Sequence, residues 1–175
     1  MRMKCRFALA LIAALTASSA PAATSDLLGD WLVQHKLVQQ WEAGRAKIQS
    51  VASELALNAM GLLDVPYKWG GNSPLTGLDC SGFVQAVYEG AAGISLPRHT
   101  SDQARATQPI APHAMEAGDL VFFNTANRPY SHVGIYLGDG KFIHSPRTGA
   151  VIRVEHLDVS YWKSRFDGAR RVVSH

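Results

Sequence analysis

The sequence predicts an α+β fold in which helices come first and a run of short antiparallel strands follows. Up to about residue 90, apolar residues recur at helical spacing. From Gly118 onward they fall instead into short runs separated by turn residues. Gly138-Asp139-Gly140, between two of these runs, is a strong hairpin signal. We therefore expect helices packed on an antiparallel sheet of about five strands.

Residues 1–23 have the pattern of an export signal. Basic side chains at residues 2–6 precede an apolar run at residues 7–17, and small residues follow. The run falls within the range of about 7–15 residues found in signal peptides and is too short to span a bilayer as a helix. We expect cleavage near Ala22 or Ala23, the alternative being an uncleaved anchor or a buried helix. Cys5 precedes the apolar run, a poor position for a lipid anchor.

Removal of this segment changes the charge balance of the chain. The segment contains three of the 17 basic residues and none of the 14 acidic ones, so the mature chain has no net charge. Such a chain has no global attraction to nucleic acid or to an anionic membrane surface. We expect no nucleic-acid partner and no stable membrane insertion after cleavage.

Cleavage would leave Cys80 as the single cysteine. A single cysteine cannot form an internal disulfide, and a free thiol in an oxidising compartment is open to oxidation. Its retention therefore suggests chemical use, although a free cysteine can also be a small, inert core residue. The cysteine count alone leaves both interpretations open.

Residues 24–49 are expected to form a helical extension before a single domain at residues 50–175. About 150 mature residues is a typical length for one domain. Trp31 and Trp41 belong to a set of apolar residues at helical spacing in this extension. We interpret them as side chains that dock on the domain, and we hypothesise that the extension shapes one subsite.

The helices of the domain are marked by apolar stripes and by capping residues. Residues 48–63 carry a stripe that must end before Pro66. A second helix is expected from Cys80 to about Gly90, with Asp79 as its N-cap. A short helix should follow Thr100.

The expected strands are residues 119–123, 132–137, 141–145, 150–154 and 166–173. The predicted hairpin places His132 and His144 on neighbouring strands. Both side chains would then be able to face the helix that begins at Cys80.

These positions suggest a thiol nucleophile with a histidine base. The positive end of the helix dipole would favour the thiolate of Cys80. His132 is the candidate base, and His144 would hold it in the correct tautomer. The backbone N–H of Cys80 and the hydroxyl of Tyr67 are candidate donors to an oxyanion.

A zinc site is the alternative for the same three side chains, since zinc accepts Cys and His ligands. The sequence offers no close ligand pair such as Cys-x-x-Cys and no obvious fourth ligand. We expect neither a metal nor an organic cofactor.

The chain resembles the NlpC-type cell-wall cysteine peptidases over residues 52–172. The motifs that carry the resemblance are, in order, Pro66-Tyr67-Lys68-Trp69-Gly70-Gly71, Gly77-Leu78-Asp79-Cys80-Ser81-Gly82-Phe83-Val84, Leu96-Pro97-Arg98, Gly118-Asp119-Leu120-Val121-Phe122-Phe123, His132-Val133-Gly134-Ile135-Tyr136-Leu137-Gly138 and Phe142-Ile143-His144-Ser145.

This resemblance implies a papain-like fold, with the nucleophile helix packed on the sheet that bears the histidines. It also implies hydrolysis of amide bonds in peptidoglycan stem peptides, typically between γ-D-glutamate and meso-diaminopimelate or lysine. The residue roles that it implies are Cys80 as nucleophile, His132 as base, His144 as third polar residue, Tyr67 as an aid to the oxyanion, and Asp79 and Ser81 as contacts to the amino end of the stem peptide.

We expect a monomer that is secreted across the inner membrane into the periplasm. An amidase or acyltransferase on the same scaffold is one alternative, and a catalytically silent wall-binding protein is another. Many relatives carry wall-binding or SH3-like modules, and residues 25–49 are too few for such a module.

Overall fold

The computed structural model describes residues 29, 31 and 37–173. The expected export signal and most of the expected N-terminal extension lie outside the described residues. Among the described residues, 43–173 belong to one compact unit. Within the described residues, no helix combines the length and the apolar character needed to cross a membrane.

The expected α+β layout is confirmed. The helices are α2 (Leu37–Met60), α3 (Cys80–Ala92), α4 (Thr100–Arg105) and α5 (Ser160–Lys163), with a 3-10 turn at Pro112–Ala114. The main sheet contains β3 (Gln108–Ile110), β4 (Leu120–Phe123), β5 (His132–Gly138), β6 (Lys141–His144), β7 (Arg153–His156) and β8 (Phe166–Arg171). These six strands are antiparallel in the order β3-β8-β4-β5-β6-β7. A small hairpin of β1 (Asn72–Ser73) and β2 (Gly77–Leu78) precedes α3.

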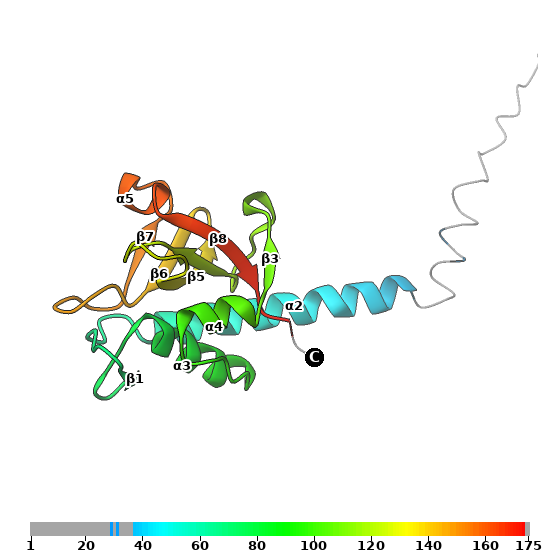
Figure 1. The fold of residues 1–175 in the computed structure, drawn as a ribbon. Coiled ribbons are helices and arrows are strands. Elements are labelled where there is room, and N and C mark those ends of the chain that lie inside the picture. Colours follow the sequence, from blue (N-terminus) through cyan, green and yellow to red (C-terminus); the bar gives the residue numbers. More distant parts are fainter. Residues whose placement is uncertain (1–28, 30, 32–36, 174–175) are drawn as a thin grey trace, which may run out of the picture. The chain divides into compact units, whose positions relative to one another are not determined.

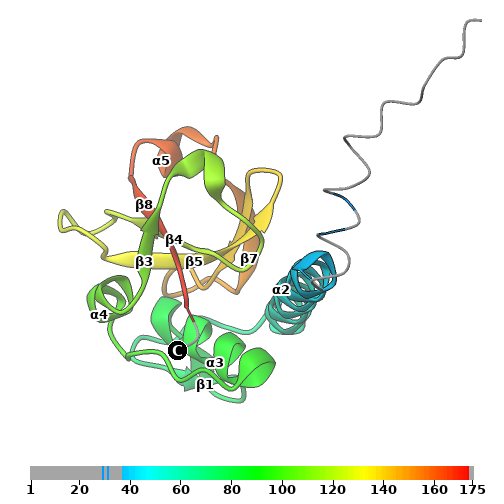
Figure 2. The ribbon, with the colours of Figure 1, turned by 90° about the vertical axis from the view of Figure 1, so that its right-hand side faces the viewer.

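Both faces of the central strands are covered. Leu120 and Phe122 of β4 join a core shared with α3, whereas Val121 and Phe123 pack with Trp162 of α5. Side chains alternate between the two faces of a strand, which explains this division. The views in Figures 1 and 2 show α3 and α5 on opposite sides of the sheet.

The first turn of α3 is held by its cap, as predicted. The side chain of Asp79 accepts a hydrogen bond from the N–H of Gly82 at 2.7 Å. The helix ends at Gly93, whose left-handed backbone (φ 64°) suits glycine. The predicted apolar face of the helix is buried, at Phe83, Val84, Val87 and Tyr88.

Several elements differ from those expected: the β1–β2 hairpin and α5 were not predicted, α2 ends at Met60 rather than at residue 63, and three further differences have a physical reason. One helix, α2, replaces the two expected around residue 47, because a single glycine such as Gly44 weakens a helix by only about 1 kcal/mol. The strand β3 was not predicted, since Pro109 is typical of loops and is tolerated only at a sheet edge, where β3 lies. The expected strand at residues 150–154 begins late, at Arg153.

The backbone of residues 150–152 forms hydrogen bonds with residues 64–67 instead of pairing with β6, which explains why β7 begins only at Arg153. The N–H of Tyr67 binds the carbonyl of Ala150 at 2.9 Å, and the N–H of Ile152 binds that of Val65 at 2.9 Å. A bridge between Pro66 and Val151 lies between them. These bonds hold the segment that carries Tyr67.

A methyl group at Gly82 should destabilise the domain, whereas one at Gly44 should not. A Cβ at Gly82 would lie 2.2 Å from the carbonyl oxygen of Gly71, and a Cβ at Gly44 has nothing within 4 Å. We expect Gly82→Ala to lower the free energy of unfolding by about 1–3 kcal/mol or more. We expect Gly44→Ala to raise it by up to about 1 kcal/mol. Urea denaturation measures both, and equal midpoints for the two variants would contradict the close approach.

Candidate active site

Cys80 is the first residue of α3, and its thiol lies against β5. Backbone N–H groups near the thiol, including that of Val133, the neighbour of His132, act to lower its pKa. Burial, and then the negative charge of Asp79, raise the pKa of Cys80 to about 11. The backbone N–H groups at the helix start favour the thiolate, as expected, but desolvation outweighs them.

His132 and His144 are brought together, as the hairpin predicted. His132 Nε2 lies 2.8 Å from His144 Nδ1. The ring of His132 stacks on the ring of Trp162, with 5.6 Å between the ring centroids. The ring of His144 lies edge-on to Trp162, with 4.9 Å between the ring centroids.

The two rings do not face α3, contrary to our expectation. Val133 and Ile143 pack in the core shared with α3. Consecutive side chains of a strand alternate, so His132 and His144 project toward the side that carries Trp162.

Both imidazoles are neutral at physiological pH. Burial, reinforced by the nearby His144, lowers the pKa of His132 to about 3. Burial also lowers the pKa of His144, against the opposing effect of Glu155. The bond between the rings therefore joins one N–H to one unprotonated nitrogen.

Glu155 is a site residue that the sequence did not reveal. Its Oε2 lies 3.6 Å from the buried Nε2 of His144. Its carboxylate also accepts bonds from Trp162 Nε1 and from Arg153 Nε, the latter at 2.5 Å. His144, Trp162 and Arg153 lower the pKa of Glu155 to about 2. A permanent negative charge therefore lies behind the histidine pair.

Tyr67 lies within electrostatic range of Cys80. Burial and the negative charges of Cys80 and Asp79 raise its pKa to about 12, and Arg98 opposes them. Its hydroxyl is therefore protonated at neutral pH and can donate a hydrogen bond.

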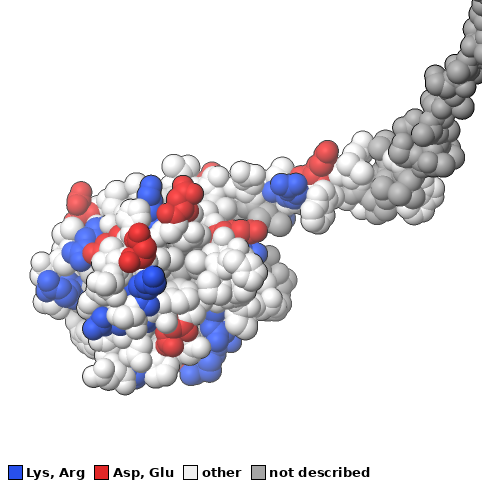
Figure 3. All heavy atoms as spheres, turned by 90° about the horizontal axis from the view of Figure 1, so that it is seen from above, with Lys and Arg blue, Asp and Glu red and all other residues white. Residues whose placement is uncertain are grey.

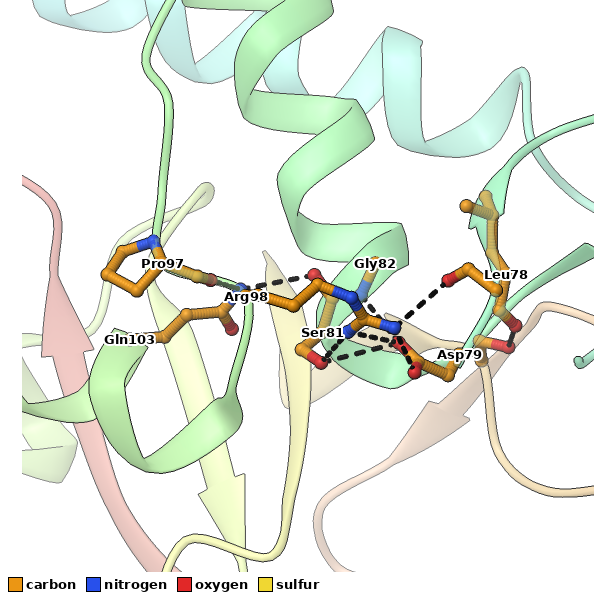
Figure 4. Close-up of polar contacts among 9 residues, drawn as sticks. Leu78, Asp79, Ser81, Gly82, Pro97, Arg98 and Gln103 are labelled. Atoms are coloured by element: carbon orange, nitrogen blue, oxygen red, sulfur yellow. Dashed lines mark hydrogen bonds and ion pairs between the residues drawn. The ribbon is translucent and has the colours of Figure 1, made fainter. Parts of the chain in front are cut away.

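Asp79 and Ser81 form a cluster with Arg98, shown in Figure 4. Arg98 Nη2 lies 2.5 Å from Asp79 Oδ2, and Arg98 Nη1 donates to Ser81 Oγ at 2.7 Å. The sequence analysis included Arg98 only as part of the motif Leu96-Pro97-Arg98 and gave it no role. No sequence pattern indicates that Arg98 pairs with Asp79, which lies 19 positions away. The cluster lies directly beside the thiol, at the first turn of α3.

Among residues 29, 31 and 37–173, no group of three His, Cys, Asp or Glu side chains is arranged to hold a metal ion.

This combination of a capped thiol helix and a histidine-bearing sheet matches a known family. Residues 64–171 match the model of the NlpC/P60 family. The chain belongs to the NlpC/P60 family. A solved NLP/P60 family protein from Staphylococcus aureus subsp. aureus Mu50, described as similar to lipoprotein, has a TM-score of 0.65 and 41% identity. That match covers 71% of this chain and 42% of the other. The papain-like α+β fold is thereby confirmed.

Curated relatives of this NlpC/P60 chain are named for different activities. It is 44% identical to murein DD-endopeptidase MepH of Escherichia coli (strain K12), over 76% of this chain and 50% of the relative. It is 37% identical to γ-D-glutamyl-L-lysine dipeptidyl-peptidase of Bacillus subtilis (strain 168), over 72% of this chain and 43% of the relative. The match thus covers about half or less of the length of these relatives.

The raised pKa of Cys80 predicts how the thiol of this NlpC/P60 domain reacts without substrate. On a Cys5→Ser background, alkylation of Cys80 by iodoacetamide should accelerate with pH toward about 11. The urea-unfolded chain is the control, and its thiol should titrate near about 8.5. A rate that is already maximal below pH 7 in the folded chain would show a resting thiolate–imidazolium pair instead.

Proposed function

We propose that the protein is a peptidoglycan stem-peptide endopeptidase that cleaves a γ-D-glutamyl–diaminopimelate-type amide bond through a covalent acyl-enzyme. The observation that carries this proposal is the position of Cys80 at the first turn of α3, where the backbone N–H of Val133, next to His132, acts to lower its pKa, together with the 2.8 Å contact between the rings of His132 and His144. Family membership and the murein-directed names of the relatives support it.

The tautomers of the histidine pair follow from Glu155. A carboxylate beside Nε2 of His144 favours the proton on that nitrogen and leaves Nδ1 as an acceptor. His132 then donates from Nε2, which leaves its own Nδ1 unprotonated. A neutral imidazole with a free Nδ1 is the form that a general base requires.

Catalysis then starts from a neutral pair. His132 takes the proton of the Cys80 thiol as the sulfur attacks the carbonyl carbon of the substrate. The backbone N–H of Cys80, at a helix start, and the hydroxyl of Tyr67 stabilise the resulting oxyanion. His132 returns the proton to the amine that leaves, and water hydrolyses the thioester. Asp79 and Ser81 contact the amino end of the stem peptide, with Arg98 holding both in place.

Substitution of Cys80 should abolish cleavage and leave the fold intact. With purified peptidoglycan, we expect Cys80→Ala to release no fragments and Cys80→Ser to be slower by about 1000-fold or more. Mass spectrometry of the fragments identifies the bond that is cut.

Circular dichroism and urea denaturation are the folding controls for both variants. Turnover by Cys80→Ala close to that of the unaltered chain would reject the nucleophile. Cleavage at another amide, or acyl transfer, would favour the amidase or acyltransferase alternative. Binding to sacculi without any release of fragments would favour a silent wall-binding protein.

We further propose that residues 1–23 direct export to the periplasm and that residues 24–49 and 50–175 form the extension and the catalytic domain of a monomer. Expression of the full chain in a Gram-negative host should yield a periplasmic product that begins near residue 23 or 24. N-terminal sequencing of that product tests the cut, and recovery of an intact Met1 from the cytoplasm would contradict it.

A further inference from the structure

A pocket beside His132 is separate from the cluster of Asp79, Ser81 and Arg98. Its volume is about 530 Å³, and its lining includes His132, Arg147 and Trp162. Arg153 and Glu155 also line it, whereas Asp79, Ser81 and Arg98 do not.

The position of His132 identifies which part of a substrate this pocket receives. The proposed mechanism makes His132 the donor of the proton to the amine that leaves, so that amine must lie within hydrogen-bond distance of its ring. The residue that carries the amine therefore continues into the space that His132 lines. The cluster at Asp79 lies beside the thiol and is assigned to the acyl part.

The charge of the pocket favours an anion. Arg153 is ion-paired with Glu155, at 2.5 Å. Arg147 lies in the exposed turn between β6 and β7, and no described residue forms a hydrogen bond or an ion pair with its guanidinium. The pocket therefore has one uncompensated positive charge, and a planar guanidinium matches a carboxylate with two parallel hydrogen bonds.

We propose that this pocket is the subsite for the leaving residue and that Arg147 binds a free carboxylate on that residue, which selects diaminopimelate over lysine. The proposal rests on the proposed endopeptidase function. Diaminopimelate keeps a free carboxylate whether it leaves through its α-amine or through its side-chain amine, and lysine lacks that group. Arg147 thus binds the side-chain carboxylate, the one group by which these two residues differ.

Matched substrates and variants test the subsite. The substrates are tetrapeptide stems, L-Ala-γ-D-Glu-X-D-Ala, in which X is diaminopimelate, diaminopimelate amidated on the side-chain carboxyl, or L-lysine. We expect Arg147→Gln to lower kcat/KM about 10-fold or more for the unmodified diaminopimelate peptide and to leave the other two values unchanged. A loss of this size corresponds to one charged hydrogen bond. Arg147→Lys should recover part of the loss. Lys141→Gln, at an exposed cation outside the pocket, is the control and should change none of the three values.

A binding measurement separates this inference from the endopeptidase proposal. In the Cys80→Ala chain, calorimetry should show tighter binding of the free carboxylate than of the amide, and Arg147→Gln should remove the difference. Such selectivity without turnover by the unaltered chain would reject the endopeptidase and keep the subsite. Cleavage of all three substrates with equal kcat/KM, or an equal loss on all three in Arg147→Gln, would overturn the subsite and keep the endopeptidase.

Discussion

The site depends on the carboxylate of Asp79, which joins the start of α3 to the chain around it. This side chain caps the helix through Gly82 and forms an ion pair with Arg98. Its own backbone N–H binds the carbonyl of Gly71 at 3.1 Å, so the turn before α3 is held from both ends. Because Cys80 is the next residue, these bonds fix the position of its side chain and determine which backbone N–H groups lie near the thiol. The absence of a Cβ at Gly82 allows the loop at Gly71 to approach this turn.

Burial determines the protonation states of Cys80, His132 and His144. The helix start and the backbone N–H groups favour a thiolate, but desolvation favours the neutral thiol and neutral imidazoles more strongly. Charge is instead placed at the rim, on Glu155 behind His144 and on Arg147 in the pocket. Over the domain face shown in Figure 3, acidic and basic side chains are interspersed, so this face has no broad positive potential. The proposed binding of an anion therefore depends on the single guanidinium of Arg147.

Much of the fold was predictable because its signals are local. The cap at Asp79, the apolar face of α3 and the hairpin at residues 138–140 each depend on neighbours within a few positions. The errors arose where distant backbone decides the outcome. Residues 150–152 have a strand-like composition, but they pair with residues 64–67, far away in the chain. The strand β3 exists because β8 offers it an edge, which Pro109 tolerates.

The sequence by itself determined the thiol helix, the pairing of the strands that carry His132 and His144, and the family, since periodicity, capping and ordered motifs are written along the chain. Only the tertiary structure decided that both rings project toward Trp162, that Glu155 lies behind them, and that Arg98 holds Asp79 and Ser81. It also decided the protonation states, because desolvation depends on how many atoms surround a group and not on its neighbours in sequence. Long-range packing sets both kinds of fact, and no local pattern encodes them.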